Sequence, residues 1–211
     1  ADYVVMESTY GGRNHPDAGP VEDQFCDVIN ETVRRGGNII IPTFAIERAQ
    51  ELLYHFNRLA RTKRIPYVMA FLDSPMAVEI TKVFEQCKKY FDEETLELFR
   101  DGQSPFDFPG LKLLESVEES KTVNLIKGSA TIMAGSGMIT GGRIKHHLVA
   151  NISRPNSSVL FVGYQASGTL GREIADGSPE VRILGQDYEV KARIVQFTGF
   201  SGHADQRQLL D

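Results

Sequence analysis

The chain has 211 residues, of which 41% are hydrophobic and 24% are charged, and its formal net charge at pH 7 is −5. This length and composition predict a soluble globular protein with one substantial domain, and no apolar run approaches the roughly twenty residues of a bilayer-spanning helix. The negative charge excludes a general attraction to nucleic acid or anionic lipid, so contact with a polyanion needs a local surface. Because no signal-peptide pattern is present, we expect a cytoplasmic protein without membrane contact.

Short apolar runs alternate with amphipathic segments along most of the chain. We expect strands at residues 3–6, 38–42, 67–72, 111–114, 130–134, 158–162, 181–184, 188–190 and 192–200. We expect helices at residues 20–35, 46–59, 75–89, 92–100, 116–127, 141–152, 169–176 and 205–210. Helical spacing of apolar residues, and caps such as Ser74 followed by Pro75, support the helices. This alternation predicts the α/β class, with a mainly parallel sheet and helices on both faces.

Polar residues follow the first and the last predicted strands. Glu7 comes directly after residues 3–6, which we expect to form a buried strand. His203 lies in a glycine-containing turn before a short helix, with Asp205 as the expected N-cap and Gln208 in the capping-box position. Sites in parallel sheets form beyond the carboxyl ends of strands, and helix starts favour anions. Glu7 and His203 would form an acid/base pair if these strand ends are neighbours; otherwise Glu7 is a solvated loop acid.

Two glycine-rich turns follow the predicted strands 130–134 and 158–162. The first turn spans residues 135–142 and is followed by Arg143, whereas the second, residues 163–172, carries hydroxyl and guanidinium donors. Glycines let backbone N–H groups approach an anion closely. The first turn lacks the GxGxxG and GK[ST] patterns of nucleotide sites, so the two turns suit a polyanion better than a nucleotide cofactor. The alternative is that the glycines serve tight packing.

The five histidines of the chain form no metal-binding pattern. None is arranged as HxH, HxxxH or HExxH, so we expect no metal site in this chain. The adjacent His146 and His147 are expected on the surface of a helix, because neighbouring helix positions diverge, and His55 is expected to be structural. Cys26 and Cys87 have no CxxC spacing and are expected to be buried thiols.

Five motifs occur in an order that resembles one known family. They are Glu7-Ser8-Thr9-Tyr10-Gly11, residues 36–51 (GGNIIIPTFAIERAQE), Ser136-Gly137-Met138 with Gly142-Arg143, Gly163-Tyr164-Gln165 with Gly168-Thr169-Leu170, and Ser201-Gly202-His203-Ala204-Asp205. The likeness covers nearly the whole chain. Together these motifs resemble the β-CASP nucleases of the metallo-β-lactamase superfamily, above all the prokaryotic relatives of the nuclease subunit that cleaves pre-mRNA 3′ ends.

This resemblance implies a zinc-dependent ribonuclease whose Rossmann-like β-CASP domain is inserted into a metallo-β-lactamase domain. Residues 1–11 would be the end segment of the metallo-β-lactamase domain, residues 12–198 the β-CASP domain, and residues 199–211 the return into the first domain. The family's HxHxDH motif and last histidine ligand are absent from this sequence. By the same resemblance, the full-length enzyme binds two zinc ions, whereas this excised region has no zinc ligands and is inactive alone.

The resemblance also implies roles for individual residues. Glu7 matches the family's acidic motif A and His203 the histidine of motif B, so His203 would protonate the leaving 3′-oxygen while Glu7 orients the imidazole. A second set of residues would hold RNA phosphates without reading bases. This set is Ser136, Gly137, Arg143, Thr169, Arg172 and Ser201. The expected partners are RNA, the missing metallo-β-lactamase domain and, in a homodimer, a second copy of the chain.

Two other classes of function remain open from the sequence. One is a non-catalytic RNA-binding or scaffold subunit of an RNA-processing complex, against which the retained Glu7 and His203 weigh. The other is a Rossmann-like enzyme that acts on a small phosphorylated metabolite. The second alternative predicts tight binding of such a metabolite and no salt-sensitive affinity for RNA.

Overall fold

A single parallel sheet forms the centre of the molecule. The computed structural model describes residues 2–14, 21–100, 102–126, 128–197 and 203–211. Within these ranges, six strands form one sheet in the order β3-β2-β4-β1-β5-β8, and every pairing in it is parallel. Its strands are β1 (Ile39–Pro42), β2 (Met69–Asp73), β3 (Leu111–Leu113), β4 (Ala130–Ala134), β5 (Ser158–Phe161) and β8 (Arg193–Gln196). A separate antiparallel pair consists of β6 (Glu180–Ile183) and β7 (Gln186–Glu189).

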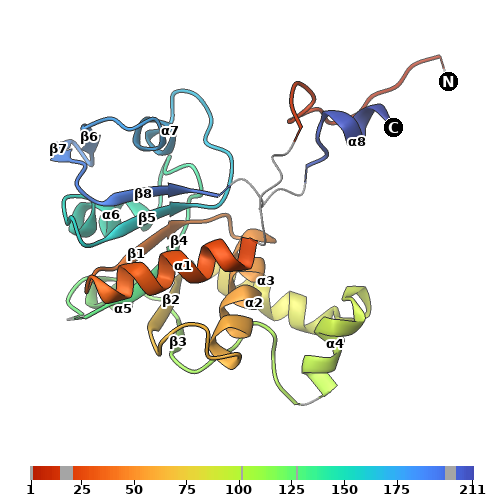
Figure 1. The fold of residues 1–211 in the computed structure, drawn as a ribbon, viewed down its shortest axis with the longest axis horizontal. Helices are drawn as coiled ribbons and strands as arrows, with labels where there is room; N and C mark the ends of the chain where they lie inside the picture. The colour runs from red at the N-terminus through yellow and green to blue at the C-terminus, as the bar shows by residue number, and fades with distance from the viewer. Residues whose placement is uncertain (1, 15–20, 101, 127, 198–202) are drawn as a thin grey trace.

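Helices cover both faces of this sheet (Figure 1), which confirms the predicted α/β class. They are α1 (Val21–Arg34), α2 (Arg48–Arg61), α3 (Pro75–Gln86), the 3₁₀ helix η1 (Lys88–Tyr90), α4 (Glu93–Arg100), α5 (Val117–Val123), α6 (Ile144–Asn151), α7 (Leu170–Ala175) and α8 (Gln206–Leu210). The predicted caps are confirmed: Ser74 accepts a hydrogen bond from the Ala77 N–H at the start of α3, and Asp205 and Gln208 form the capping box of α8. No described helix is long and apolar enough to cross a membrane.

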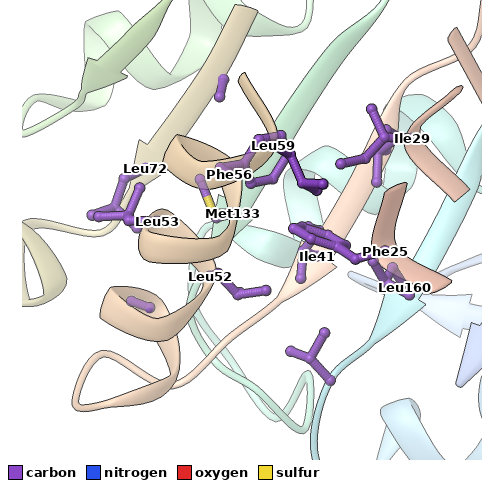
Figure 2. Packing of buried hydrophobic residues seen from close by; sticks show 14 of the residues in the cluster. Phe25, Ile29, Ile41, Leu52, Leu53, Phe56, Leu59, Leu72, Met133 and Leu160 are labelled. Atoms are coloured by element: carbon purple, nitrogen blue, oxygen red, sulfur yellow. The ribbon is translucent and has the colours of Figure 1, made fainter. Parts of the chain in front are cut away.

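The core has two layers because successive side chains of a strand point to opposite faces of the sheet. Ile39 and Ile41 of β1 lie in the layer with α1 and α2, where the rings of Phe25 and Phe56 meet edge to face with centroids 4.8 Å apart (Figure 2). Ile40 lies in the other layer, which α5, α6 and α7 complete. All five side chains are fully buried. Strand β1 is therefore apolar throughout, because both of its faces are covered.

The predicted strand at residues 3–6 is wrong. This run is described and has no strand geometry, and Tyr3 and Val5 are 92% and 99% exposed. A strand needs a neighbour that satisfies its backbone hydrogen bonds, and among the described residues no strand pairs with this run. Further along, Tyr10 makes an isolated bridge with Asp205. Apolar composition without a pairing partner therefore does not produce a buried strand.

Both cysteines are free thiols, but the predicted burial holds for one of them. Cys26 of α1 is buried, and its Sγ lies 3.4 Å from the carbonyl oxygen of Arg64. Cys87 is partly exposed because it is the C-cap of α3, where the chain leaves the packed helix for η1.

Candidate functional site

Glu7 and His203 are in contact, although they come from opposite ends of the chain. Oε2 of Glu7 lies 3.2 Å from Nδ1 of His203. The same oxygen accepts a hydrogen bond from the Thr9 N–H at 3.1 Å, and Oε1 accepts one from the Ala204 N–H at 3.1 Å. The carboxylate is therefore bonded to both terminal segments and holds the imidazole edge that carries Nδ1.

The two terminal segments also bind each other through the start of α8. The Gln206 N–H donates to the Arg13 carbonyl at 3.0 Å, and the Arg207 N–H donates to Oδ1 of Asn14 at 3.1 Å. The first N–H groups of a helix lack partners within the helix, so these bonds satisfy them from the other end of the chain. Figure 1 shows residues 2–14 beside α8, together with both chain ends.

The surroundings keep Glu7 ionised. The hydrogen bond from the Thr9 backbone is the main cause that lowers the pKa of Glu7, and the Ala204 N–H and the neighbouring His203 act in the same direction. Desolvation of the carboxyl group opposes this shift but does not outweigh it. The Glu7 and His203 side chains are 45% and 56% exposed. The pair is therefore a carboxylate and an imidazole that a dissolved ligand can reach.

A cavity of about 430 Å³ opens beside this pair. Its lining consists of Thr9, Tyr10, Phe44, Ile46, Glu47, Arg48, Met138, Gly163, Tyr164 and His203. Phe44, Met138 and Gly163 belong to the segments that follow β1, β4 and β5. The terminal segments therefore meet the carboxyl edge of the sheet, which is where parallel α/β folds place their ligand sites.

The first glycine-rich turn is folded on itself. Oγ of Ser136 accepts hydrogen bonds from the N–H groups of Thr140 at 3.0 Å and Gly141 at 3.3 Å. Gly142 has a φ of +79°, and a Cβ there would lie 2.2 Å from the carbonyl oxygen of Gly135. The Ser136 hydroxyl is therefore engaged within its own turn, and backbone packing requires the glycine at position 142.

Gly137, another predicted phosphate-binding residue, packs against an aromatic ring. A Cβ on Gly137 would lie 2.7 Å from two carbon atoms of the Phe44 ring. This close approach is a packing role for the glycine, which the sequence left open as the alternative to anion binding.

Arg143 is bonded to a carboxylate in the interior. Its Nη1 donates to Oδ1 of Asp73 at 2.7 Å, and its Nη2 donates to the Glu115 carbonyl at 2.8 Å. The Arg143 side chain is 20% exposed, whereas that of Asp73 is fully buried. The guanidinium group therefore fastens the first glycine-rich turn to the end of β2.

The prediction that His147 lies on a helix surface is wrong. The residue is fully buried, with Nε2 2.6 Å from Oδ2 of Asp73 and Nδ1 3.0 Å from Oδ1 of Asn124. Burial raises the pKa of Asp73, but the hydrogen bonds from His147, Ser120 and Arg143 together lower it below its ordinary value. A buried carboxylate needs such partners, which explains why α6 turns this imidazole inward.

The second glycine-rich turn forms a separate site. Thr169 is the N-cap of α7, and its Oγ1 accepts a hydrogen bond from the Arg172 N–H at 3.2 Å. Nε of Arg172 donates to both carboxylate oxygens of Asp176, at 2.8 and 2.9 Å. Thr169 and Arg172 line a cavity of about 340 Å³. Among the described residues, this cavity has no lining residue in common with the cavity beside His203. Ser201 lies outside the described residues.

The described residues contain no group of three or more His, Cys, Asp or Glu side chains that could hold a metal ion. Asp73 was not among the site residues predicted from the sequence, although a signal was present. Asp73 directly follows a predicted strand, as Glu7 does, and the same argument from the ends of strands applies to it. The cavity-lining rings of Phe44 and Tyr164 were missed because aromatic residues in loops carry no pattern that separates packing from binding.

Two domain families match the sequence of this chain. The Beta-Casp domain matches residues 49–174, and the Zn-dependent metallo-hydrolase RNA specificity domain matches residues 187–211. Ribonuclease TTHA0252 of Thermus thermophilus is 43% identical over 211 residues, which are all of this chain and 48% of that protein.

More distant similarity links the chain to archaeal proteins. The transcription termination factors FttA of Methanothermobacter thermautotrophicus and Thermococcus kodakarensis are each 35% identical to it, over 99% and 98% of this chain. The matched regions make up 34% and 33% of those proteins. The chain therefore spans about half the length of the ribonuclease and about a third of the length of the termination factors.

Proposed function

The chain belongs to the β-CASP family, and from this premise we propose that it is the β-CASP region of a zinc-dependent ribonuclease with a metallo-β-lactamase fold. Identity of 43% to a protein named as a ribonuclease supports this function, as does the match to an RNA specificity domain. The observation that carries the proposal is the 3.2 Å contact between Glu7 and His203, an acid and an imidazole at the carboxyl edge of the sheet.

We propose that residues 1–11 and 199–211 belong to a metallo-β-lactamase domain and that residues 12–198 form the β-CASP domain. The hydrogen bond from the Ala204 N–H to Glu7 supports this division, because it ties the two terminal segments to each other. Exposure of the apolar residues 3–6 also supports it. Apolar runs of this kind mark surfaces that another protein surface covers.

His203 acts as the general acid in this function. A water molecule adds to the phosphorus atom and loses a proton to the solvent, the bond from phosphorus to the 3′-oxygen breaks, and His203 gives a proton from Nε2 to the leaving oxygen. Glu7, which is ionised at neutral pH, holds the imidazole ring in position through Nδ1. An acid of this kind contributes about 10² to 10⁴ in rate.

Zinc is expected from the family, whose second matching domain is described as Zn-dependent. The described residues contain no cluster that fits a metal ion, so we assign no zinc ligand to them. The metal ligands would belong to other parts of the full-length protein. The roles proposed for Glu7 and His203 rest on the contact between these two side chains and involve no metal ligand.

The phosphate-binding role of the second set of residues stays a prediction. Ser136 and Arg143 already form bonds within the protein, so we propose that they hold the first glycine-rich turn in shape beside the RNA backbone. Arg172 is 45% exposed although its Nε is bonded to Asp176, so we propose that the exposed part of its guanidinium contacts phosphate, with Thr169 in the same cavity. Gly137 and Ser201 complete the proposed path.

Cleavage of RNA by the full-length, zinc-loaded protein tests the function. His203→Ala should lower the single-turnover cleavage rate about 10²- to 10⁴-fold and leave the Kd for RNA nearly unchanged. His146→Ala, at an exposed histidine of α6, is the matched control and should alter neither quantity. Equal losses in cleavage and binding would refute the acid role of His203, whereas a wild-type protein that does not cleave RNA would refute the ribonuclease function.

A non-catalytic RNA-binding factor is the second candidate. The archaeal relatives that are named transcription termination factors favour it, whereas the contact between Glu7 and His203 weighs against it. The two candidates differ in the same assay, because the second predicts salt-sensitive RNA binding without zinc-dependent cleavage.

A further inference from the structure

Phe44 is an exposed aromatic ring whose position is fixed by two glycines. It follows β1, and 41% of its surface is exposed. A Cβ on Gly137, after β4, would lie 2.7 Å from Cδ2 and Cε2 of the ring, and a Cβ on Gly163, after β5, would lie 3.6 Å from Cε2. The ring therefore packs directly on the backbone of two loops. Gly137 and Gly163 have no side chains, so the backbone of the two loops holds the ring in place.

This ring separates two cavities. Phe44 lines the cavity of about 430 Å³ beside His203 and also a further cavity of about 370 Å³, whose lining includes Met76, Ser136 and Arg143. Among the described residues, Phe44 is the lining residue that the two cavities share. A ligand that occupied both cavities would therefore contact the Phe44 ring.

The surface around the ring is apolar and partly aromatic. Ile46, Met76 and Tyr164 are 64%, 65% and 44% exposed. The rings of Tyr10 and Tyr164 meet edge to face with centroids 6.5 Å apart. Exposed apolar side chains that gather at one place mark a binding surface, and exposed aromatic faces favour a flat partner with its own π-electrons.

The charged residues of the cavity beside His203 do not suit a phosphate group as its main occupant. Glu47 contributes an exposed carboxylate to the lining. Arg48 is the arginine in the same lining, and its guanidinium forms an ion pair with Glu51. A carboxylate repels phosphate but accepts hydrogen bonds from the amino groups of nucleobases.

We propose that Phe44 and Tyr164 form a stacking platform for one RNA base next to the cleaved bond, with that base in the cavity beside His203. This inference rests on the proposed ribonuclease function and adds to it a contact with the face of a base. Every base has a π-face, so stacking of this kind tolerates different bases. Glu47 adds a preference for a base that carries an amino group.

Single-turnover cleavage by the full-length, zinc-loaded protein tests the platform. Phe44→Leu removes the ring but keeps an apolar side chain, and we expect it to lower kcat/KM for a short RNA about 10- to 100-fold. Phe44→Trp keeps an aromatic face and should retain most of the activity. Tyr90→Leu, at a 76% exposed aromatic residue of η1, is the matched control and should cleave RNA as the wild type does.

Abasic RNA separates stacking from a general defect. The base is removed in turn from each of the two nucleotides that flank the cleaved bond. At one of these positions the wild type and Phe44→Leu should become equally slow, because the ring has no base to contact. If Phe44→Leu cleaves intact RNA as fast as the wild type, or if its defect persists in full on both abasic RNAs, the platform is overturned.

Fluorescence of 2-aminopurine, placed at the same two positions, reports stacking without cleavage. We expect quenching at one position on the wild type and on Phe44→Trp, and its loss on Phe44→Leu. Gly137→Ala should also reduce quenching, because the added Cβ displaces the ring. RNA that binds without any quenching refutes the platform even if it is cleaved. Absence of cleavage by the wild type, in contrast, refutes the ribonuclease function, so the two failures are distinct.

Discussion

Two carboxylate–imidazole contacts in this molecule use the same chemistry in opposite surroundings. Asp73 and His147 lie 2.6 Å apart and are fully buried, whereas Glu7 and His203 lie 3.2 Å apart and are about half exposed. The surroundings lower the pKa of both carboxyl groups, but side-chain donors do so for Asp73 and chiefly backbone N–H groups do so for Glu7. Burial, rather than residue type, therefore separates the contact that holds the fold from the contact that a substrate can reach.

Among the changes considered, removing the buried charge of Asp73 should have the largest effect on stability. Asp73→Asn leaves Arg143 and His147 without their anion, and we expect it to lower the free energy of unfolding of the 211-residue chain by about 3–5 kcal/mol. Urea denaturation followed by circular dichroism measures this change. Asp176→Asn, which breaks the exposed pair with Arg172, is the control and should barely move the midpoint. A small effect of Asp73→Asn would mean that the interior network is dispensable.

A change in the first glycine-rich turn disturbs the buried region without touching either carboxylate. Gly142→Ala forces a Cβ into a residue with φ of +79° and against the carbonyl oxygen of Gly135. We expect a loss of about 1–3 kcal/mol in the free energy of unfolding. Gly141→Ala is the matched control, because among the described residues nothing lies within 4 Å of its added Cβ. Equal stability of the two variants would contradict this assignment of roles.

The contribution of the buried Asp73 contact to stability should depend on pH. The folded-state pKa of Asp73 is below its unfolded value of about 3.9, so its stabilising contribution is fully present above that pH and is lost as the pH falls through the folded-state pKa. The difference in unfolding free energy between the wild type and Asp73→Asn should shrink as the pH falls below about 4. Urea titrations above and below this pH test the prediction. A difference in unfolding free energy that grows as the pH falls would contradict it.

The smallest effect on stability is expected at the exposed contact. Glu7→Gln should leave the urea midpoint of the chain unchanged, because the side chain is solvated and its charge is screened. In the full-length protein the same change should slow RNA cleavage, since the carboxylate that orients the His203 ring through Nδ1 is lost. Unfolding and cleavage measured on one preparation would distinguish a functional contact from a structural one. A shifted urea midpoint with normal cleavage would mean that the contact between Glu7 and His203 is structural and not functional.

The sequence predicted the features that depend on local patterns. Residues 130–134 form β4 at the predicted bounds, and the caps formed by Ser74 and Asp205 are where the side chains indicated. Such features follow from apolar runs and from donors and acceptors a few residues apart. The order of strands in the sheet, in contrast, depends on contacts between distant segments, and no local pattern specifies it.

Several features that the sequence did not predict depend on a distant neighbour. His147 is buried because Asp73, far away in the chain, needs a donor. Gly137 is required because the Phe44 ring rests on it. Residues 3–6 are apolar, as a strand would be, yet among the described residues no strand lies beside them. In each case the residue type was informative, but its role depended on a partner that the pattern does not name.

The parallel order of the sheet has a consequence for biosynthesis. Strand β1 lies between β4 and β5, and Ile39 pairs with Thr131 and Ser158. A ribosome therefore releases the three isoleucines of β1 long before either adjoining strand exists. Pairings between such distant segments form slowly, and an unpaired apolar strand attracts other unfinished chains. Yield in a cell should thus depend on how well chaperones shield residues 39–42 until the second half of the polypeptide has been translated.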